Sequence, residues 1–320
     1  MFSILKVTFV FFMKTKTASW IILIVLSCIW GSSFILMKEG LKGFSSDEVA
    51  ALRITIASLF LLPFLIKYYK IDLRKNIKGL LLAGVFGNLI PAFLFTKAET
   101  EISSSLTGML NALTPLFTIV IGFLFFKQTI SRNQLIGVGI GFVGAIALIY
   151  FGDNADSSKN TMYCLLVALA TLFYALSVNA INTYLSGINS IVATVWSFTL
   201  IGPMAACYLF GFTDVVKHAS ENPAAGSSLF FISILAIFGS ALSVIAFNQL
   251  IKLSGTVFAS SCTYLIPIVA IAWGFLYGEI INLLQIAMVG VIILGIWIMK
   301  SKGKTGVEEG QLPEVAPEKD

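Results

Sequence analysis

The chain has 320 residues, of which 58% are hydrophobic and 12% are charged, and its mean hydropathy is +0.93. Soluble domains average about 45–50% apolar and about 25% charged residues, so this composition excludes an ordinary soluble protein and indicates a polytopic membrane protein whose main partner is the lipid bilayer. The net charge of +5 comes from basic residues between apolar runs, without interleaved aromatics, so no nucleic-acid partner is expected.

The two ends of the chain differ from the apolar segments between them. Residues 1–18 are expected to form an N-terminal cytoplasmic segment. The apolar residues 1–13 are too few for the roughly 20 that span a bilayer and lack a cleavage site, so they either lie on the membrane surface or precede a translation start at Met13. Met1 and Met13 both stay open as the start of translation. Residues 300–320 are polar and rich in Glu and Pro, which predicts a disordered cytoplasmic tail.

Ten apolar segments of about the length that crosses a bilayer follow one another between these ends. The residues Ser45 to Glu48 predict a capping box at the start of the second segment, and Gly152, Gly187, Gly211 and Gly255 are expected to break helices at or between span ends. The expected spans are about 19–37, 47–67, 78–97, 104–126, 133–151, 161–184, 189–212, 227–251, 255–278 and 282–299.

A sequence repeat organises these spans. Residues 113–124, LTPLFTIVIGFL, return as residues 265–276, LIPIVAIAWGFL, with Pro115 matching Pro267. Extended upstream, the offset gives nine identities over 39 positions, which indicates an internal duplication. Each copy contains five spans, an odd number, so the second copy is inserted upside down. The predicted fold is therefore all-α, with ten transmembrane helices as two inverted five-helix repeats, 19–151 and 161–299.

Basic residues predict the orientation of the chain. With the N-terminus inside, 14 Lys and Arg residues fall on the inner side and 5 on the outer side, leaving out Arg53 within a span and Lys319 in the tail. Cytoplasmic loops carry the excess of Lys and Arg. Both termini are therefore expected in the cytoplasm, in a bacterial-type inner (plasma) membrane.

Polar and aromatic residues share helix faces in repeat-related spans. Inverted repeats place a substrate site near the midplane between the halves, whereas the alternative is that small polar residues only bind helices together. Pro115 and Pro267 are hinges or merely bends. The substrate-binding candidates are Trp30, Ser33, Arg53, Asn88, Phe95, Asn111, Tyr174, Ser177, Ser240, Ser243, Phe247, Ser260, Thr263 and Tyr264.

Arg53 is the one charged residue well inside an expected span. A buried guanidinium costs roughly 2.5–3.5 kcal/mol on insertion scales, which favours a functional role, although Arg53 could also reach the interface or pair with Asp47 or Glu48. The charged residues Lys97, Glu99, Glu101 and Glu279 stand at span ends and are expected to be solvated. No span contains a deep carboxylate, so the sequence gives no support for a proton relay.

Other motifs argue against an enzyme. Cys28, Cys164, Cys207 and Cys262 each lie alone in an apolar segment, His218 is the one histidine, and no hydrolase or metal motif is present. We therefore expect no catalytic residues, no metal and no cofactor. The GxxxG motif from Gly137 to Gly141 is more typical of packing within a chain than of a dimer face, which leaves a homodimer open.

Several motifs together resemble the EamA-type transporters of the drug/metabolite transporter superfamily. They are CIWGSSF at 28–34, LRITIASLFLL around Arg53, and the LTPLFT and LIPIVA segments. The resemblance covers about residues 18–300. It implies ten helices in two inverted halves, a cavity lined by spans one, three, four, six, eight and nine, and paired aromatic positions at Trp30 and Tyr174. One departure is Lys127-Gln128, where the family often has Gly-Glu, a pair kept as Gly278-Glu279.

These observations together predict a secondary transporter. The expected activity is alternating-access export of small neutral or zwitterionic metabolites, such as amino acids, because phosphorylated substrates would need clustered basic residues and Arg53 stands alone. The alternatives are a nucleotide-sugar or organophosphate exchanger of the same superfamily, and a channel or scaffold that transports nothing.

Overall fold

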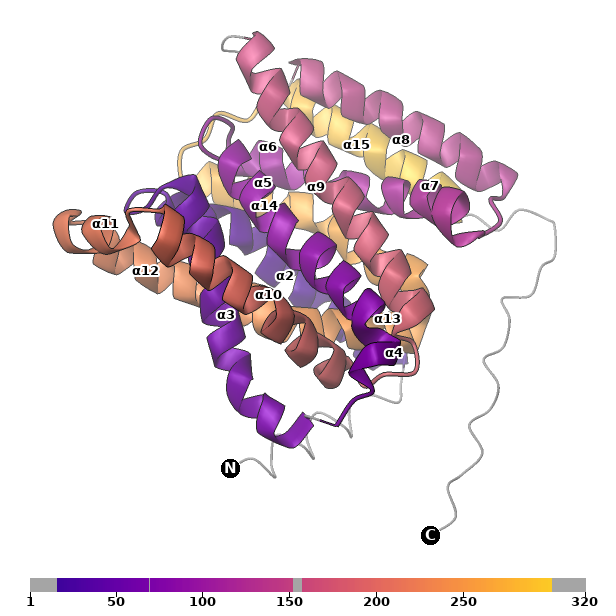
Figure 1. The fold of residues 1–320 in the computed structure, drawn as a ribbon. Coiled ribbons are helices and arrows are strands. Elements are labelled where there is room, and N and C mark those ends of the chain that lie inside the picture. Colours follow the sequence, from indigo (N-terminus) through magenta and orange to yellow (C-terminus); the bar gives the residue numbers. More distant parts are fainter. Residues whose placement is uncertain (1–15, 69, 152–156, 301–320) are drawn as a thin grey trace.

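The computed structural model describes residues 16–68, 70–151 and 157–300, and within these ranges all regular elements are helical (Figure 1). Most of the expected N-terminal segment, the choice between Met1 and Met13, and the tail beyond residue 300 lie outside the described residues. Nine helical segments of the described ranges are long and apolar enough to cross a membrane, and Leu283–Met299 is a shorter apolar helix. The expected all-α polytopic fold is confirmed.

The helices follow the expected spans closely. Span four, expected at 104–126, is Ser104–Phe126, and the other bounds differ by a few residues. The elements are α2 (Lys16–Gly40), α3 (Ser46–Tyr68), α4 (Leu73–Leu81), η1 (Leu82–Leu89), α5 (Ile90–Ala98), α6 (Ser104–Leu110), η2 (Asn111–Leu113), α7 (Thr114–Phe126), α8 (Arg132–Phe151), α9 (Ser157–Tyr184), α10 (Ser190–Phe212), α11 (Val215–Glu221), α12 (Ala225–Ile234), η3 (Leu235–Leu242), α13 (Ser243–Ser260), α14 (Cys262–Leu276) and α15 (Leu283–Lys300).

Local signals explain where several helices begin and end. The predicted capping box is formed: the Glu48 side chain accepts the backbone N–H of Ser45 at 2.8 Å, and Ser45 Oγ accepts the N–H of Glu48 at 3.4 Å. Asn189 Oδ1 accepts the N–H of Ile191 at the start of α10. Gly255 has φ +76 and separates the eighth and ninth spans, as the sequence predicts, because glycine adopts this conformation without a steric penalty.

Equivalent helices of the two halves make equivalent contacts. Helix α2, the first span, packs on α14, the ninth, and α9, the sixth span, packs on α7 of the fourth. Helices α3 and α10 form a second pair, and α8 and α15 a third (Figure 1). The third and eighth spans each contain a π-helical turn, η1 and η3, where the chain carries one extra residue per turn. This pairing is the arrangement expected of two related five-helix units.

The GxxxG motif lies in the contact between α8 and α15. A Cβ added at Gly137 would clash with the carbonyl oxygen of Gly295, and one added at Gly295 would lie 2.6 Å from the backbone N of Gly141. Glycines therefore allow two helices of the same chain to approach backbone to backbone. The motif serves packing within the chain.

Candidate substrate cavity

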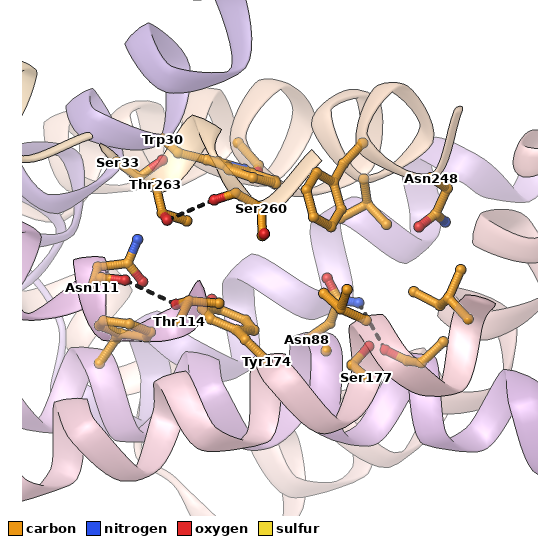
Figure 2. A pocket seen from close by; sticks show the side chains of 18 of the residues that line it. Trp30, Ser33, Asn88, Asn111, Thr114, Tyr174, Ser177, Asn248, Ser260 and Thr263 are labelled. Atoms are coloured by element: carbon orange, nitrogen blue, oxygen red, sulfur yellow. Dashed lines mark hydrogen bonds between the residues drawn. The ribbon is translucent and has the colours of Figure 1, made fainter. Parts of the chain in front are cut away.

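A central cavity lies between the two halves (Figure 2). It contains about 970 Å³ of space free of protein atoms, including the part that is open to its surroundings. We call the end of the bundle where α2 begins the terminal end, and the end where α2 finishes the far end. Ile181, Thr194 and Ser260 line the cavity within four residues of the ends of their spans, so it extends towards the terminal end.

Two aromatic pairs from opposite halves line the cavity. The rings of Trp30 and Phe247 lie 5.1 Å apart, edge to face, and those of Tyr174 and Phe95 lie 5.6 Å apart, stacked. Trp30 corresponds to Tyr174 in the repeat, and Phe247 corresponds to Phe95. Each aromatic residue of the first or sixth span thus packs on a phenylalanine of the other half, which builds matching apolar walls.

Two repeat-related glycines bring the π-helical turns close to the first and sixth spans. A Cβ on Gly87 would clash with Ser177 Oγ, and one on Gly239 would lie 3.0 Å from Ser33 Oγ. The carbonyl oxygen of Gly239 also accepts the indole N–H of Trp30 at 2.9 Å. Because π-helical turns often occur at functional sites, their position beside the cavity agrees with a ligand-binding role for this region.

Arg53 lines the cavity and points towards the second half. Its Nε donates to Ser240 Oγ at 2.7 Å, and Nη1 lies 3.8 Å from the Met37 sulfur. The pairing with Asp47 or Glu48 that the sequence left open is not formed, because Glu48 binds Ser45 and His218 instead. Arg53 is the one charged side chain among the described residues that line the cavity, and no carboxylate forms an ion pair with it there.

Three polar atoms of lining residues are buried without a hydrogen-bond partner within the described ranges: Asn111 Oδ1, Ser197 Oγ and Asn248 Oδ1. Asn248 Nδ2 donates to Thr194 Oγ1 at 2.9 Å, which orients the amide. A buried polar atom without a partner costs about 1–3 kcal/mol. Two carbonyl oxygens and a hydroxyl are therefore poised to accept hydrogen bonds from a ligand.

The prolines have different local settings. Pro115 follows the 3₁₀ turn η2, and Thr114 Oγ1 donates at 2.9 Å to the carbonyl oxygen of Asn111, which Pro115 cannot bond. Pro267 lies inside α14. Both are buried, and their role as hinges stays a prediction.

The cavity brings together eleven of the fourteen residues predicted from sequence and leaves three outside its lining. Ser240 bonds Arg53, Ser243 Oγ donates to the carbonyl oxygen of Phe238 within the π-helical region, and Tyr264 packs against a buried apolar cluster. The eleven are Trp30, Ser33, Arg53, Asn88, Phe95, Asn111, Tyr174, Ser177, Phe247, Ser260 and Thr263.

The sequence interpretation missed the contribution of the seventh span. Thr194 and Ser197 of α10 line the cavity, as do Thr114 and Asn248. Thr194 and Ser197 are three residues apart and so share a helix face, which was the available signal. The repeated segments of the sequence do not include this span.

At the far end, Glu99 corrects the expectation of a solvated carboxylate. Its exposed fraction is 0%, while Lys97 and Glu101 are exposed as predicted. Burial raises the pKa of the Glu99 carboxyl well above its usual value, an effect that Lys38 opposes and Glu279 reinforces. Glu279 itself accepts the backbone N–H groups of Ser104 and Ser105 at 2.8 and 2.9 Å, and so ties the second half to the first turn of α6.

The loops after the fourth and ninth spans have the same geometry. Gly278 has φ +77 and Lys127 has φ +55, so Lys127 occupies the left-handed position that glycine holds in the second half. The next residues fold back alike: Gln128 Oε1 would clash with a Cβ on Gly122, and Glu279 Oε2 would lie 2.5 Å from one on Gly274. Gln128 donates to Asn179 Oδ1 at 2.9 Å, so the missing acid is replaced by an amide contact.

The model of the EamA-like transporter family matches residues 18–150 and again residues 161–301. The chain belongs to this family. Two EamA-like matches therefore cover both sets of five spans. An uncharacterised transporter of Archaeoglobus fulgidus is 24% identical over 88% of this chain and 99% of its own length. The uncharacterised inner membrane transporter YedA of Escherichia coli is 27% identical over 88% of this chain and 90% of its own length.

Two further comparisons concern function and fold. A probable terminal-alkyne amino-acid exporter of Streptantibioticus cattleyicolor is 20% identical over 84% of this chain and 88% of its own length. One crystal structure matches with a TM-score of 0.63 at 13% identity, over 89% of this chain and 97% of that chain, which shows the shared fold alone. The family and these relatives indicate a membrane transporter rather than an enzyme.

Proposed function

We propose that this EamA-family transporter carries small zwitterionic metabolites, of which amino acids are the main class, across the inner membrane by alternating access. The observation that carries the proposal is the lining of the cavity: one cation, Arg53, together with uncharged acceptors. A carboxylate would bind Arg53, and an ammonium group would donate to an acceptor on Asn111 or on Asn248, which lie at opposite ends of the cavity (Figure 2).

The aromatic side chains that line the cavity suit the apolar part of such a ligand. Trp30 with Phe247 and Tyr174 with Phe95 offer apolar surface on both sides of the polar groups, as Figure 2 shows for Trp30 and Tyr174. A phosphorylated substrate would carry more negative charge than one guanidinium can balance, so the lining favours an amino acid over a nucleotide sugar or an organophosphate.

The proposal includes the orientation of the chain and the direction of transport. The bias of 14 inner against 5 outer basic residues supports cytoplasmic termini, and the similarity to a probable amino-acid exporter of Streptantibioticus cattleyicolor supports export. Alternating access follows from two inverted units around one cavity. A homodimer is not required, since the cavity is formed within one chain.

Counterflow in liposomes tests the proposal. The purified protein is reconstituted into vesicles loaded with one unlabelled amino acid at a time, and uptake of the labelled form is measured with and without an excess of UDP-sugar. Saturable counterflow that the UDP-sugar does not inhibit supports the proposal. Flux that does not saturate identifies a channel, and the absence of flux across the panel contradicts amino-acid transport.

A further inference from the structure

A buried carboxylate lies one helical turn beyond the cavity. The backbone N–H of Glu99 donates to the carbonyl oxygen of Phe95, a cavity residue, at 3.0 Å. Four residues of helix rise about 6 Å, so Glu99 lies between the cavity and the far end. Its side chain has an exposed fraction of 0%, and neither carboxylate oxygen has a hydrogen-bond partner within the described ranges.

The charged groups near Glu99 form hydrogen bonds with atoms other than its carboxylate. Lys38 on α2 donates its ammonium group to the backbone carbonyl oxygens of Glu99 and Ile102, at 2.8 and 3.0 Å. Arg53 on α3 bonds Ser240, and the Glu279 carboxylate holds the first amides of α6. The phenol of Tyr174 on α9 interacts electrostatically with Arg53, and its ring stacks on Phe95.

An ionised carboxylate in this position would be unstable. Removing a carboxylate from water without hydrogen-bond donors is strongly unfavourable. Lys38 and Arg53 attract the charge only from a distance, without a hydrogen bond to the carboxylate. Protonation removes the charge. Burial thus explains why the pKa of Glu99 lies well above its usual value in this structure.

Glu99 lies beside the contacts that close the far end of the bundle. Ala98 and Ile102, on either side of it, are fully buried, and the Glu279 contacts to Ser104 and Ser105 join the two halves beside it. A movement that separates the two halves at the far end breaks the Glu279 contacts to Ser104 and Ser105. Water would then reach Glu99.

We propose that Glu99 is a proton-binding site whose occupation is coupled to the closing of the far end. The carboxyl group holds a proton while this end is closed and releases it to water when the end opens; on closing, one proton from the same side binds the carboxylate again, and no other bond changes. The inference rests on the proposed alternating access.

The sign of the pH dependence follows from linkage. The pKa of Glu99 is raised in the closed state and returns towards its usual value in the open state, so acid favours the closed state and alkali favours the open one. Between the two pKa values, the ratio of open to closed protein rises up to tenfold, about 1.36 kcal/mol, for each unit of pH.

Infrared spectroscopy tests the proton site without any substrate. The full-length protein at neutral pH should show the carbonyl stretch of a protonated, buried carboxylic acid, which shifts in deuterated water. Glu99→Asp should move this band and Glu99→Gln should abolish it, whereas Glu101→Gln, which changes an exposed glutamate two residues away, should leave it. Absence of the band in the unmodified protein, or its persistence in Glu99→Gln, overturns the proposal.

Distance measurements test the coupling. Spin labels at Lys97→Cys and Tyr277→Cys, in a background with the four natural cysteines replaced by alanine, should report more of the open state as pH rises. Glu99→Gln should make this distribution independent of pH, and Glu101→Gln should not. A pH response unchanged by Glu99→Gln, or no response at all, contradicts the coupling.

Failure of every counterflow assay would instead contradict the transport function, and the infrared result would still decide the proton site.

Discussion

At the scale of single residues, the proposed binding of a carboxylate depends on Arg53, the one charged side chain among the described residues that line the cavity. A hydrogen bond to a charged group contributes about 1.5–3 kcal/mol, equivalent to about 10- to 150-fold in affinity. We expect Arg53→Gln to weaken counterflow of an amino acid by about this factor, because the carboxylate loses its cationic partner while the Ser240 hydroxyl keeps a donor. The measurement is the half-saturating concentration in proteoliposomes.

The matched ligand for this test is the amide of the same amino acid, which lacks the carboxylate. Competition by the amide should be equal for Arg53→Gln and the unmodified protein. Equal losses for both ligands would mean that Arg53 supports the fold of the cavity instead of binding a carboxylate.

Lys127 is a second residue with a specific effect, because its backbone conformation lowers the stability of the fold. It is the one non-glycine residue with positive φ among the described residues, and a side chain in this conformation costs roughly 1–2 kcal/mol. We expect Lys127→Gly to raise the free energy of unfolding by about 1 kcal/mol, seen as a higher midpoint of thermal unfolding in detergent. Gly278→Lys, the same exchange reversed in the other half, should lower the midpoint. A lower midpoint for Lys127→Gly would refute the interpretation.

At the scale of helices, the contact between α8 and α15 depends on individual glycines. A Cβ at Gly137 would clash with the Gly295 backbone, which cannot move without displacing the helix, whereas one at Gly139 would meet no atom within 4 Å. We expect Gly137→Ala to destabilise the protein by about 1–3 kcal/mol. Gly139→Ala should be neutral or slightly stabilising. Thermal unfolding in detergent compares the two, and equal effects would show that the helices are not held this closely.

Helices are also the scale at which the sequence was most informative. The lengths of the apolar segments predicted the spans. The capping box at Ser45 and the break at Gly255 were recognisable from residue type alone. The π-helical turns η1 and η3 could not be predicted, since a shift of backbone bonding by one residue leaves no pattern in composition. They matter here because they hold Gly87 and Gly239 against the first and sixth spans.

Part of the candidate site could likewise be predicted from the sequence, and part could not. Repeat-related faces predicted nearly half of the residues that line the cavity, including the four aromatic residues of the two pairs. The contribution of Thr194 was missed because the seventh span enters through packing, not through the repeat. The burial of Glu99 was missed because a charge next to a loop is normally solvated, and its enclosure depends on Lys38 and Ile102 of neighbouring segments.

At the scale of the whole molecule, alternating access requires the far end to open during transport. Ser105 on α6 and Gly274 on α14 belong to different halves, and a Cβ built on Gly274 would lie 2.9 Å from Ser105 Cβ. Disulfides join Cβ atoms about 3.5–4.5 Å apart, so a shift of about 1 Å would let Ser105→Cys and Gly274→Cys form one. Oxidation of the double variant should abolish counterflow, because the closed far end can no longer separate.

Reduction of that disulfide should restore counterflow, and each single variant should be insensitive to oxidant. The reduced double variant also controls for any disturbance of the Glu279 contact beside Gly274. Its counterflow gives the rate against which the oxidised protein is compared. Undiminished counterflow by fully cross-linked protein would show that substrate moves without separation of the halves at this end. Transport by rocking of two inverted units would then be excluded, because both units would be joined throughout the cycle.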